Sequence, residues 1–87
     1  MTQILLPDGD RIVLHGLSAP EAERGSIVRF HSSGRPRWVA RPPQGPGQDA
    51  FVAIQLQGGA LVADSFQGLN IRIDLDSGAL LESGFVK

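Results

Sequence analysis

Four basic side chains, Arg29, His31, Arg35 and Arg37, flank a Ser33-Gly34 break in the chain. If Ser33 lies near the centre of a hairpin turn, strand alternation pairs Arg29 with Arg37 and His31 with Arg35 on one face. Like charges directly opposite each other in a ladder are unfavourable, so an anionic group should lie above them. Guanidinium groups suit carboxylates and phosphates because they bind them in a bidentate geometry. The spacing therefore predicts an anion-binding surface on this hairpin.

The anion could belong to a partner or to the same chain. The first half of the chain has more basic than acidic residues, and the second half has the reverse. Internal ion pairs could therefore use second-half acids, for example Asp64, Asp74 or Glu82. The same alternation places the apolar residues of the hairpin on its opposite face, namely Val28, Phe30, Pro36 and Trp38. Both interpretations stay open, and the partner-binding one assigns Arg29, His31, Arg35 and Arg37 to the contact.

Asp74 and Asp76 would lie on one strand face and could contribute to a cation site. A calcium loop needs further oxygen ligands and a glutamate at a fixed distance, and the sequence lacks them. His15 and His31 belong to different expected strands, without the spacing of a zinc motif. We therefore predict a solvated hairpin end at Asp74 and Asp76, and no metal site.

Nucleophilic catalysis needs a nucleophile, a base and an orienting group close together in space. Ser65, His15 and Asp64 could form such a set only if the fold brought them together, and their spacing is not diagnostic. No glycine-rich phosphate loop is present, because Gly58-Gly59 is typical of a hairpin turn. The sequence predicts a protein that is not an enzyme and uses no cofactor.

Short apolar-alternating runs separated by turn residues dominate the chain. After Phe51 the runs are FVAIQLQ, GALVADSF, LNIRIDL and ALLESGFVK. Their spacing is typical of an antiparallel meander. Before Pro42, strands are expected around Ile4–Leu6, Arg11–His15, Ser26–His31 and Arg35–Arg41, with at most one short helical turn near 18–24. Asp76-Ser77-Gly78 fits a three-residue hairpin loop with a bulge. The expected class is all-β, with about eight short strands in two meander units.

The length of 87 residues predicts a single domain. The stretch 42–49, rich in proline and glycine, would join two halves, 1–43 and 49–87. The chain has no cysteine, which excludes a disulfide framework and fits a cytoplasmic location. The net charge of −1 gives no reason to expect nucleic acid or an anionic membrane as a partner, and the N-terminus does not have the pattern of a signal peptide.

The two halves resemble imperfect copies of each other. GSIVRFHSSGRPRW at 25–38 echoes GLNIRIDLDSGALLES at 68–83. Val28-Arg29-Phe30 falls on Ile71-Arg72-Ile73, and Ser33-Gly34 falls on Ser77-Gly78. A period of about 45 residues with four strands per copy lies in the range of β-propeller blades.

The pattern of each copy is similar to one blade of quinoprotein-type β-propellers, in which a blade ends in an aspartate, a Thr-Gly turn and a tryptophan. Asp74, Ser77 and Gly78 match this pattern in part, and Trp38 occupies the tryptophan position of the first copy. The second copy departs from it, since no tryptophan follows Gly78. The resemblance implies four-stranded units and no cofactor. Two units cannot close a ring, so they should pack as a sandwich, a flattened barrel or two blade-like sheets, or assemble with other copies.

Two functions are compatible with these features. The first is a small interaction module, similar in size to bacterial accessory proteins, that binds another protein through the Arg-rich hairpin. The second is a homo-oligomer that binds a small anionic or carbohydrate ligand between units.

Overall fold

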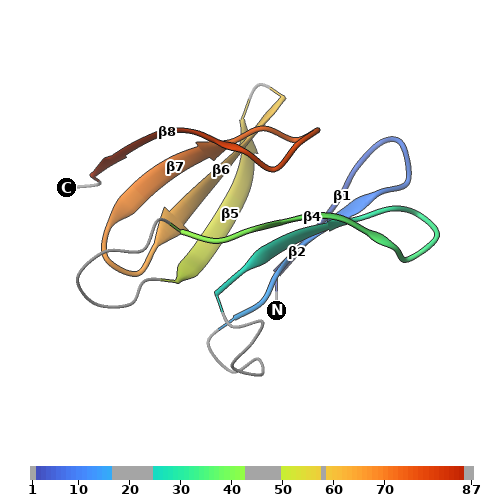
Figure 1. Ribbon diagram of the computed structural model, residues 1–87, viewed down its shortest axis with the longest axis horizontal. Helices are drawn as coiled ribbons and strands as arrows, with labels where there is room; N and C mark the ends of the chain where they lie inside the picture. Colours follow the sequence, from blue (N-terminus) through green and yellow to red (C-terminus); the bar gives the residue numbers. More distant parts are fainter. Residues whose placement is uncertain (1, 17–24, 43–49, 58, 86–87) are drawn as a thin grey trace.

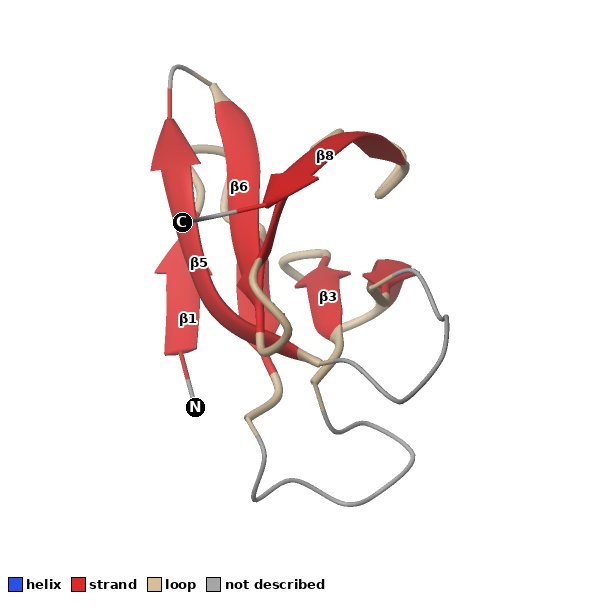
Figure 2. Cartoon of the chain, turned by 90° about the vertical axis from the view of Figure 1, so that its left-hand side faces the viewer, coloured by secondary structure: helices blue, strands red, loops and turns tan. Residues whose placement is uncertain are grey.

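Alternating apolar residues and glycine-containing turns produce eight β-strands in the part of the chain that the structure describes. This computed structural model describes residues 2–16, 25–42, 50–57 and 59–85 (Figure 1). The strands are β1 (Thr2–Leu5), β2 (Arg11–Leu14), β3 (Ile27–Phe30), β4 (Pro36–Ala40), β5 (Phe51–Gln57), β6 (Ala60–Ser65), β7 (Leu69–Ile73) and β8 (Leu80–Phe85). Figure 2 shows strands and loops but no helix among the described residues. The all-β prediction is confirmed.

Each half of the chain forms its own four-stranded sheet. The strand orders are β1-β2-β3-β4 and β5-β6-β7-β8, and every pair is antiparallel. Strands that are neighbours in the sequence are therefore neighbours in the sheet, which is the predicted pair of meanders. Residues 18–24, near which a helical turn was expected, and residues 43–49 of the expected proline- and glycine-rich loop at 42–49 lie outside the described residues.

The two sheets share one hydrophobic core. Its buried members come from β2, β3 and β4 of the first sheet and from β5, β6 and β7 of the second, and they are Ile12, Leu14, Ile27, Trp38, Ala40, Phe51, Leu61, Ala63, Ile71 and Ile73. Removing these side chains from water provides the main favourable free energy for packing one sheet on the other. A backbone hydrogen bond of 2.9 Å from the Phe51 amide to the Gly25 carbonyl also connects the halves.

The β3–β4 and β7–β8 hairpins close with loops of different length. In the first, the His31 amide donates to the Arg35 carbonyl at 2.7 Å, which leaves Ser32, Ser33 and Gly34 in the loop. In the second, the Asp74 amide donates to the Ala79 carbonyl at 2.9 Å, which leaves the four residues Leu75–Gly78. The predicted three-residue loop at Asp76–Gly78 is therefore one residue too short. Its left-handed glycine is confirmed, since Gly78 has φ +75°.

No helix in the described parts of the chain is long and apolar enough to cross a membrane.

Candidate functional site

A β-bulge changes the register of the Arg-rich hairpin. Arg29 lies opposite Trp38, and Phe30 lies opposite Pro36, so Arg37 is an extra residue in β4. The predicted pairing of Arg29 with Arg37 is therefore wrong, whereas the pairing of His31 with Arg35 at the turn is confirmed. A bulge inserts one residue into one strand and re-aims the side chains beside it. Simple alternation cannot reveal it.

The bulge also reverses the predicted position of Trp38, which was expected on the face opposite Arg29. Trp38 lies in the shared core with 8% of its surface exposed. Its indole Nε1 donates to the carbonyl of Leu75, in the β7–β8 loop, at 2.7 Å. The tryptophan therefore connects the sheets and offers no exposed stacking platform.

Arg29 directs its guanidinium to internal partners. Nε donates to Asp10 Oδ2 at 3.0 Å, Nη2 to Asp8 Oδ2 at 2.9 Å and Nη1 to the Leu75 carbonyl at 2.7 Å. The Arg29 side chain is 9% exposed. Its closest carboxylates thus come from the first half, and the second half contributes the Leu75 carbonyl and Asp76 at 3.9 Å.

Asp10 is the carboxylate that joins the two arginines. Its Oδ2 accepts from Arg29 Nε and, at 2.6 Å, from Arg37 Nε, while the Ser32 amide donates to Oδ1 at 3.2 Å. Burial by itself raises the pKa of Asp10, but the hydrogen bonds and charges of Arg37 and Arg29 outweigh it and lower that pKa below its ordinary value of 3.8. We call this group the Arg29 clasp, consisting of Asp8, Asp10, Arg29, Arg37 and the Leu75 carbonyl.

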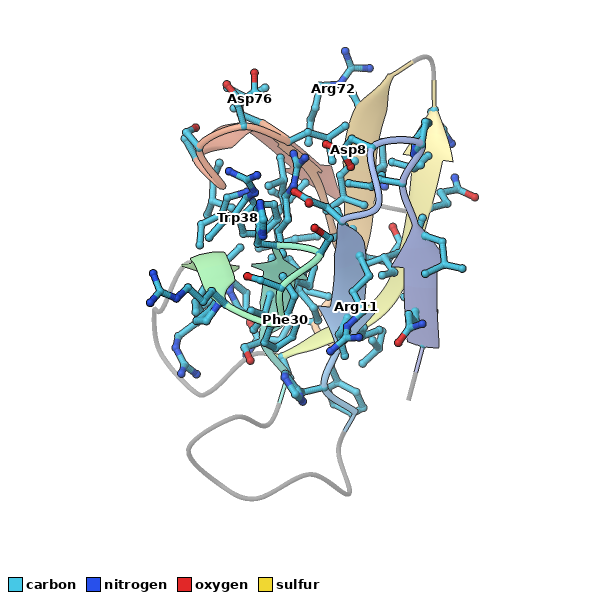
Figure 3. The ribbon with its side chains drawn as sticks, turned by 90° about the vertical axis from the view of Figure 1, so that its right-hand side faces the viewer. Asp8, Arg11, Phe30, Trp38, Arg72 and Asp76 are labelled. Carbon is cyan, nitrogen blue, oxygen red and sulfur yellow. The ribbon has the colours of Figure 1, made fainter. Side chains whose placement is uncertain are left out.

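Sequence reasoning missed the two aspartates of the clasp. Asp8 and Asp10 belong to a Pro-Asp-Gly-Asp turn, which is typical of a solvated loop. The signal that could have identified them is strand pairing, because β2 pairs with β3 through Arg11 and Phe30 and so brings Asp10 beside the next hairpin. Figure 3 shows Asp8 above Arg11 and Phe30, whose side chains form a cation–π contact of 5.2 Å.

The tip of the β3–β4 hairpin carries an open cavity of about 480 Å³. It is lined by His31, Ser33, Arg35, Pro36 and Arg37. Arg35 and Arg37 are exposed and His31 is half-buried. None of the lining residues is acidic, so the polar surface of the cavity is dominated by hydrogen-bond donors. Three of the four predicted binding residues line this cavity, and the fourth, Arg29, is buried in the clasp, where it shares Asp10 with Arg37.

The other candidate residues have local roles. The Asp76 amide donates to Asp74 Oδ1 at 2.8 Å, and no group of three or more His, Cys, Asp or Glu among the described residues could hold a metal ion. His15 and His31 follow opposite ends of the β2–β3 pair, since Leu14 pairs with Ile27 and Arg11 with Phe30.

Ser65 and Asp64, two members of the possible nucleophilic set named from the sequence, form hydrogen bonds within their own hairpin. Ser65 Oγ accepts from the Leu69 amide at 3.0 Å, and Asp64 Oδ1 accepts from Asn70 Nδ2 at 2.7 Å. Both bonds are between neighbours of the β6–β7 hairpin, so each residue has a structural explanation within it.

A family model described as "Domain of unknown function (DUF7957)" matches residues 1–85, so the chain belongs to this family. No curated protein and no solved structure matches the chain.

Proposed function

We propose that this member of the DUF7957 family is a non-enzymatic interaction module that binds another protein through the exposed tip of the β3–β4 hairpin. The contact residues are His31, Arg35 and Arg37, and Arg29 shares the carboxylate of Asp10 with Arg37. The observation that supports this proposal is the exposure of Arg35. This cation lines an open cavity in which no acidic residue takes part.

Arg37 adds a second feature that favours recognition. Its Nε is held by the buried carboxylate of Asp10, so part of its conformational freedom is already lost before a partner binds. Restricting a long side chain in advance lowers the entropy cost of binding. Arginine is also among the residues that contribute most to protein–protein contacts.

Site-specific photo-cross-linking tests the proposed surface. A photo-reactive amino acid replaces Ser33, the central residue of the β3–β4 loop, and in a matched control it replaces Gln67, the central residue of the β6–β7 loop. Both loops end in a left-handed glycine, Gly34 with φ +95° and Gly68 with φ +98°. We expect a discrete cross-linked protein from position 33 alone, and its loss in the Arg35→Glu background.

Equal cross-linking from positions 33 and 67, or a cross-link that survives Arg35→Glu, would contradict the proposal. Arg29 is unsuitable for this test because reversing its charge would place a third carboxylate beside Asp8 and Asp10 inside the clasp. Arg72→Glu, on the exposed face of β7, is the matched charge-reversal control and should leave the cross-link unchanged.

A second candidate function is supported by β5. This strand is an edge strand of its sheet. It has seven residues and contains neither a charged residue nor a proline. Natural sheets usually protect such edges with lysine, proline or a covering segment. Pairing of β5 with a second copy would produce the homo-oligomer in which an anionic or carbohydrate ligand binds between units.

Molar mass by light scattering across a hundredfold dilution tests the oligomer. A dimer or larger assembly that dissociates in a variant with Leu56→Lys, an exposed position of β5, would support it, because a lysine on an edge strand opposes pairing. A monomer at all concentrations would exclude it. Ala53→Ser, on the same strand, is a control that adds no charge.

A further inference from the structure

We propose that the cavity at the hairpin tip binds a phosphate monoester carried by a side chain of the partner protein. This inference rests on the proposed function and adds the chemical identity of the group that is recognised.

The turn determines which nitrogen of His31 carries hydrogen. The backbone amide of Ser33, which can only donate, is 3.0 Å from His31 Nδ1, and Ser33 Oγ is 2.9 Å from the same atom. Nδ1 is therefore an acceptor, and the hydrogen of the neutral ring is on Nε2. His31 consequently presents an N–H donor from its outer edge, and the loop holds the ring in one orientation.

The two arginines supply the remaining donors. Arg37 uses Nε to bind Asp10 at 2.6 Å, so its terminal nitrogens stay at the outer end of an anchored side chain. Arg35 is exposed, and its guanidinium forms no hydrogen bond or ion pair with any of the residues that the structure describes. Guanidinium groups bind phosphate oxygens with bidentate geometry.

Charge balance identifies Arg35 as the cation available to a ligand. Within the clasp, the charges of Asp8 and Asp10 offset those of Arg29 and Arg37. Arg35 lies outside this group and no acidic residue shares its cavity. An anion at the tip would therefore neutralise the charge of Arg35, the only unbalanced charge among the residues that line the cavity.

The number of donor groups favours phosphate over carboxylate. Three separate groups, the His31 imidazole and the two guanidinium groups, surround one cavity. A phosphate monoester has three terminal oxygens, so each donor group can have an acceptor oxygen of its own. A carboxylate has only two oxygens, so one oxygen would have to accept hydrogen bonds from two of the three donor groups.

The experiment is an NMR titration of the full chain labelled with ¹⁵N, at pH 7 and constant ionic strength. The probes are N-acetyl-O-phosphoserine amide, inorganic phosphate and acetate. We expect saturable shifts of the His31 ring and of the amides of Ser32–Arg35 with both phosphate probes, and about tenfold weaker binding of acetate. Arg35→Gln should weaken phosphate binding about tenfold, because a charge-assisted hydrogen bond is lost. Arg72→Gln should leave it unchanged.

Several outcomes would overturn the inference. Equal affinities for acetate and phosphate would assign the cavity to carboxylates, and unchanged phosphate binding in Arg35→Gln would place the anion elsewhere. Tighter binding of a single-stranded oligonucleotide than of the phosphoserine probe would assign the site to nucleic-acid phosphates. If no phosphate probe binds while the cross-link from position 33 still depends on Arg35, this inference fails and the proposed function stands. If phosphate binds and no protein cross-links, the cavity is a phosphate site, but the proposed function fails and with it the part of this inference that places the phosphate on a partner protein.

Discussion

The β3–β4 and β7–β8 hairpins have similar sequences but use opposite faces. In both, the register shifts by one residue directly after the aligned arginine, between Arg29 and Phe30 and between Arg72 and Ile73. Arg29 is nonetheless buried in the clasp, whereas Arg72 is exposed and points away from Trp38 in Figure 3.

The residues around each arginine explain the difference. On β3, Ile27 belongs to the core and lies two positions from Arg29, so both face the other sheet. On β7, Ile71 and Ile73 belong to the core and flank Arg72, which therefore faces outward. Side chains alternate between faces with a period of two, so choosing the other face moves every aligned residue from inside to outside. Similarity between repeats thus indicates hairpin geometry, and packing decides which face becomes the core.

The largest expected effect comes from removing the buried arginine. Arg29→Ala should destabilise the fold by about 3–5 kcal/mol, because it leaves the carboxylate of Asp10 buried without one of its charged partners. Arg72→Ala, at the aligned position, should change the free energy of unfolding by about 0.5 kcal/mol or less. Urea denaturation of both variants measures the contrast. Equal losses would show that the two arginines have equivalent environments and would remove the comparison.

The next largest effect is the difference in stability cost between alanine substitutions at Gly34 and at Gly78, the left-handed glycines of the two hairpin loops. A Cβ on Gly78 would lie 2.6 Å from Trp38 Cδ2, whereas a Cβ on Gly34 meets nothing within 4 Å. Gly34→Ala should cost about 1–2 kcal/mol from the backbone conformation alone, and Gly78→Ala about 2–4 kcal/mol because it adds a steric clash. In a Trp38→Ala background the extra cost at Gly78 should disappear. An extra cost that persists there would mean that the clash is not with the indole.

A smaller effect is expected from the indole N–H. Trp38→Phe removes the donor to the Leu75 carbonyl but leaves the Arg29 donor to the same oxygen. We expect a loss of about 1–2 kcal/mol from one hydrogen bond and a slightly smaller ring. Thermal unfolding measures it, and the control is Phe66→Leu, which changes an exposed aromatic residue at the β6–β7 turn. A loss as small as that of Phe66→Leu would contradict the hydrogen bond between the sheets.

The smallest expected effect is a dependence of the free energy of unfolding on pH that arises from Asp10, in the first half of the chain. Because the pKa of Asp10 is lowered in the folded state, its stabilising contribution is complete above its ordinary value of 3.8 and is lost as pH falls through the lower folded value. Asp10→Asn should therefore be less stable than the unmodified chain at pH 7, and this difference should shrink as the pH falls below 3.8. Urea midpoints from pH 7 to pH 3 test it. A difference that stays constant would show that the Asp10 charge contributes nothing.

The strands and turns could be predicted because they depend on short-range patterns. The alternation in LNIRIDL and the glycine at position 78 are visible without any knowledge of tertiary contacts. The internal echo also predicted two sheets of equal strand number. The strands and the turns are each determined by residues within a few positions of one another.

The clasp could not be predicted because it depends on an inserted residue and on contacts between hairpins. Nothing in RPRWVAR marks Arg37 as the extra residue of a bulge, so parity placed Trp38 on the wrong face. Asp10 becomes a partner of Arg29 through the pairing of β2 with β3, and Leu75 becomes one through the packing of the sheets. Composition favoured acids of the second half, which contributes mainly a backbone carbonyl.

The strictly sequential order of strands in each sheet has a kinetic consequence. Every hairpin joins neighbouring segments, and local contacts of this kind form early, on a scale of about 1–10 μs for an isolated hairpin. The bonds from Arg29 and Trp38 to Leu75 span 46 and 37 positions, so they require a much larger loop to close. We expect the sheets to develop separately and to join late, so that changes at Leu75 or Gly78 accelerate unfolding far more than they slow folding.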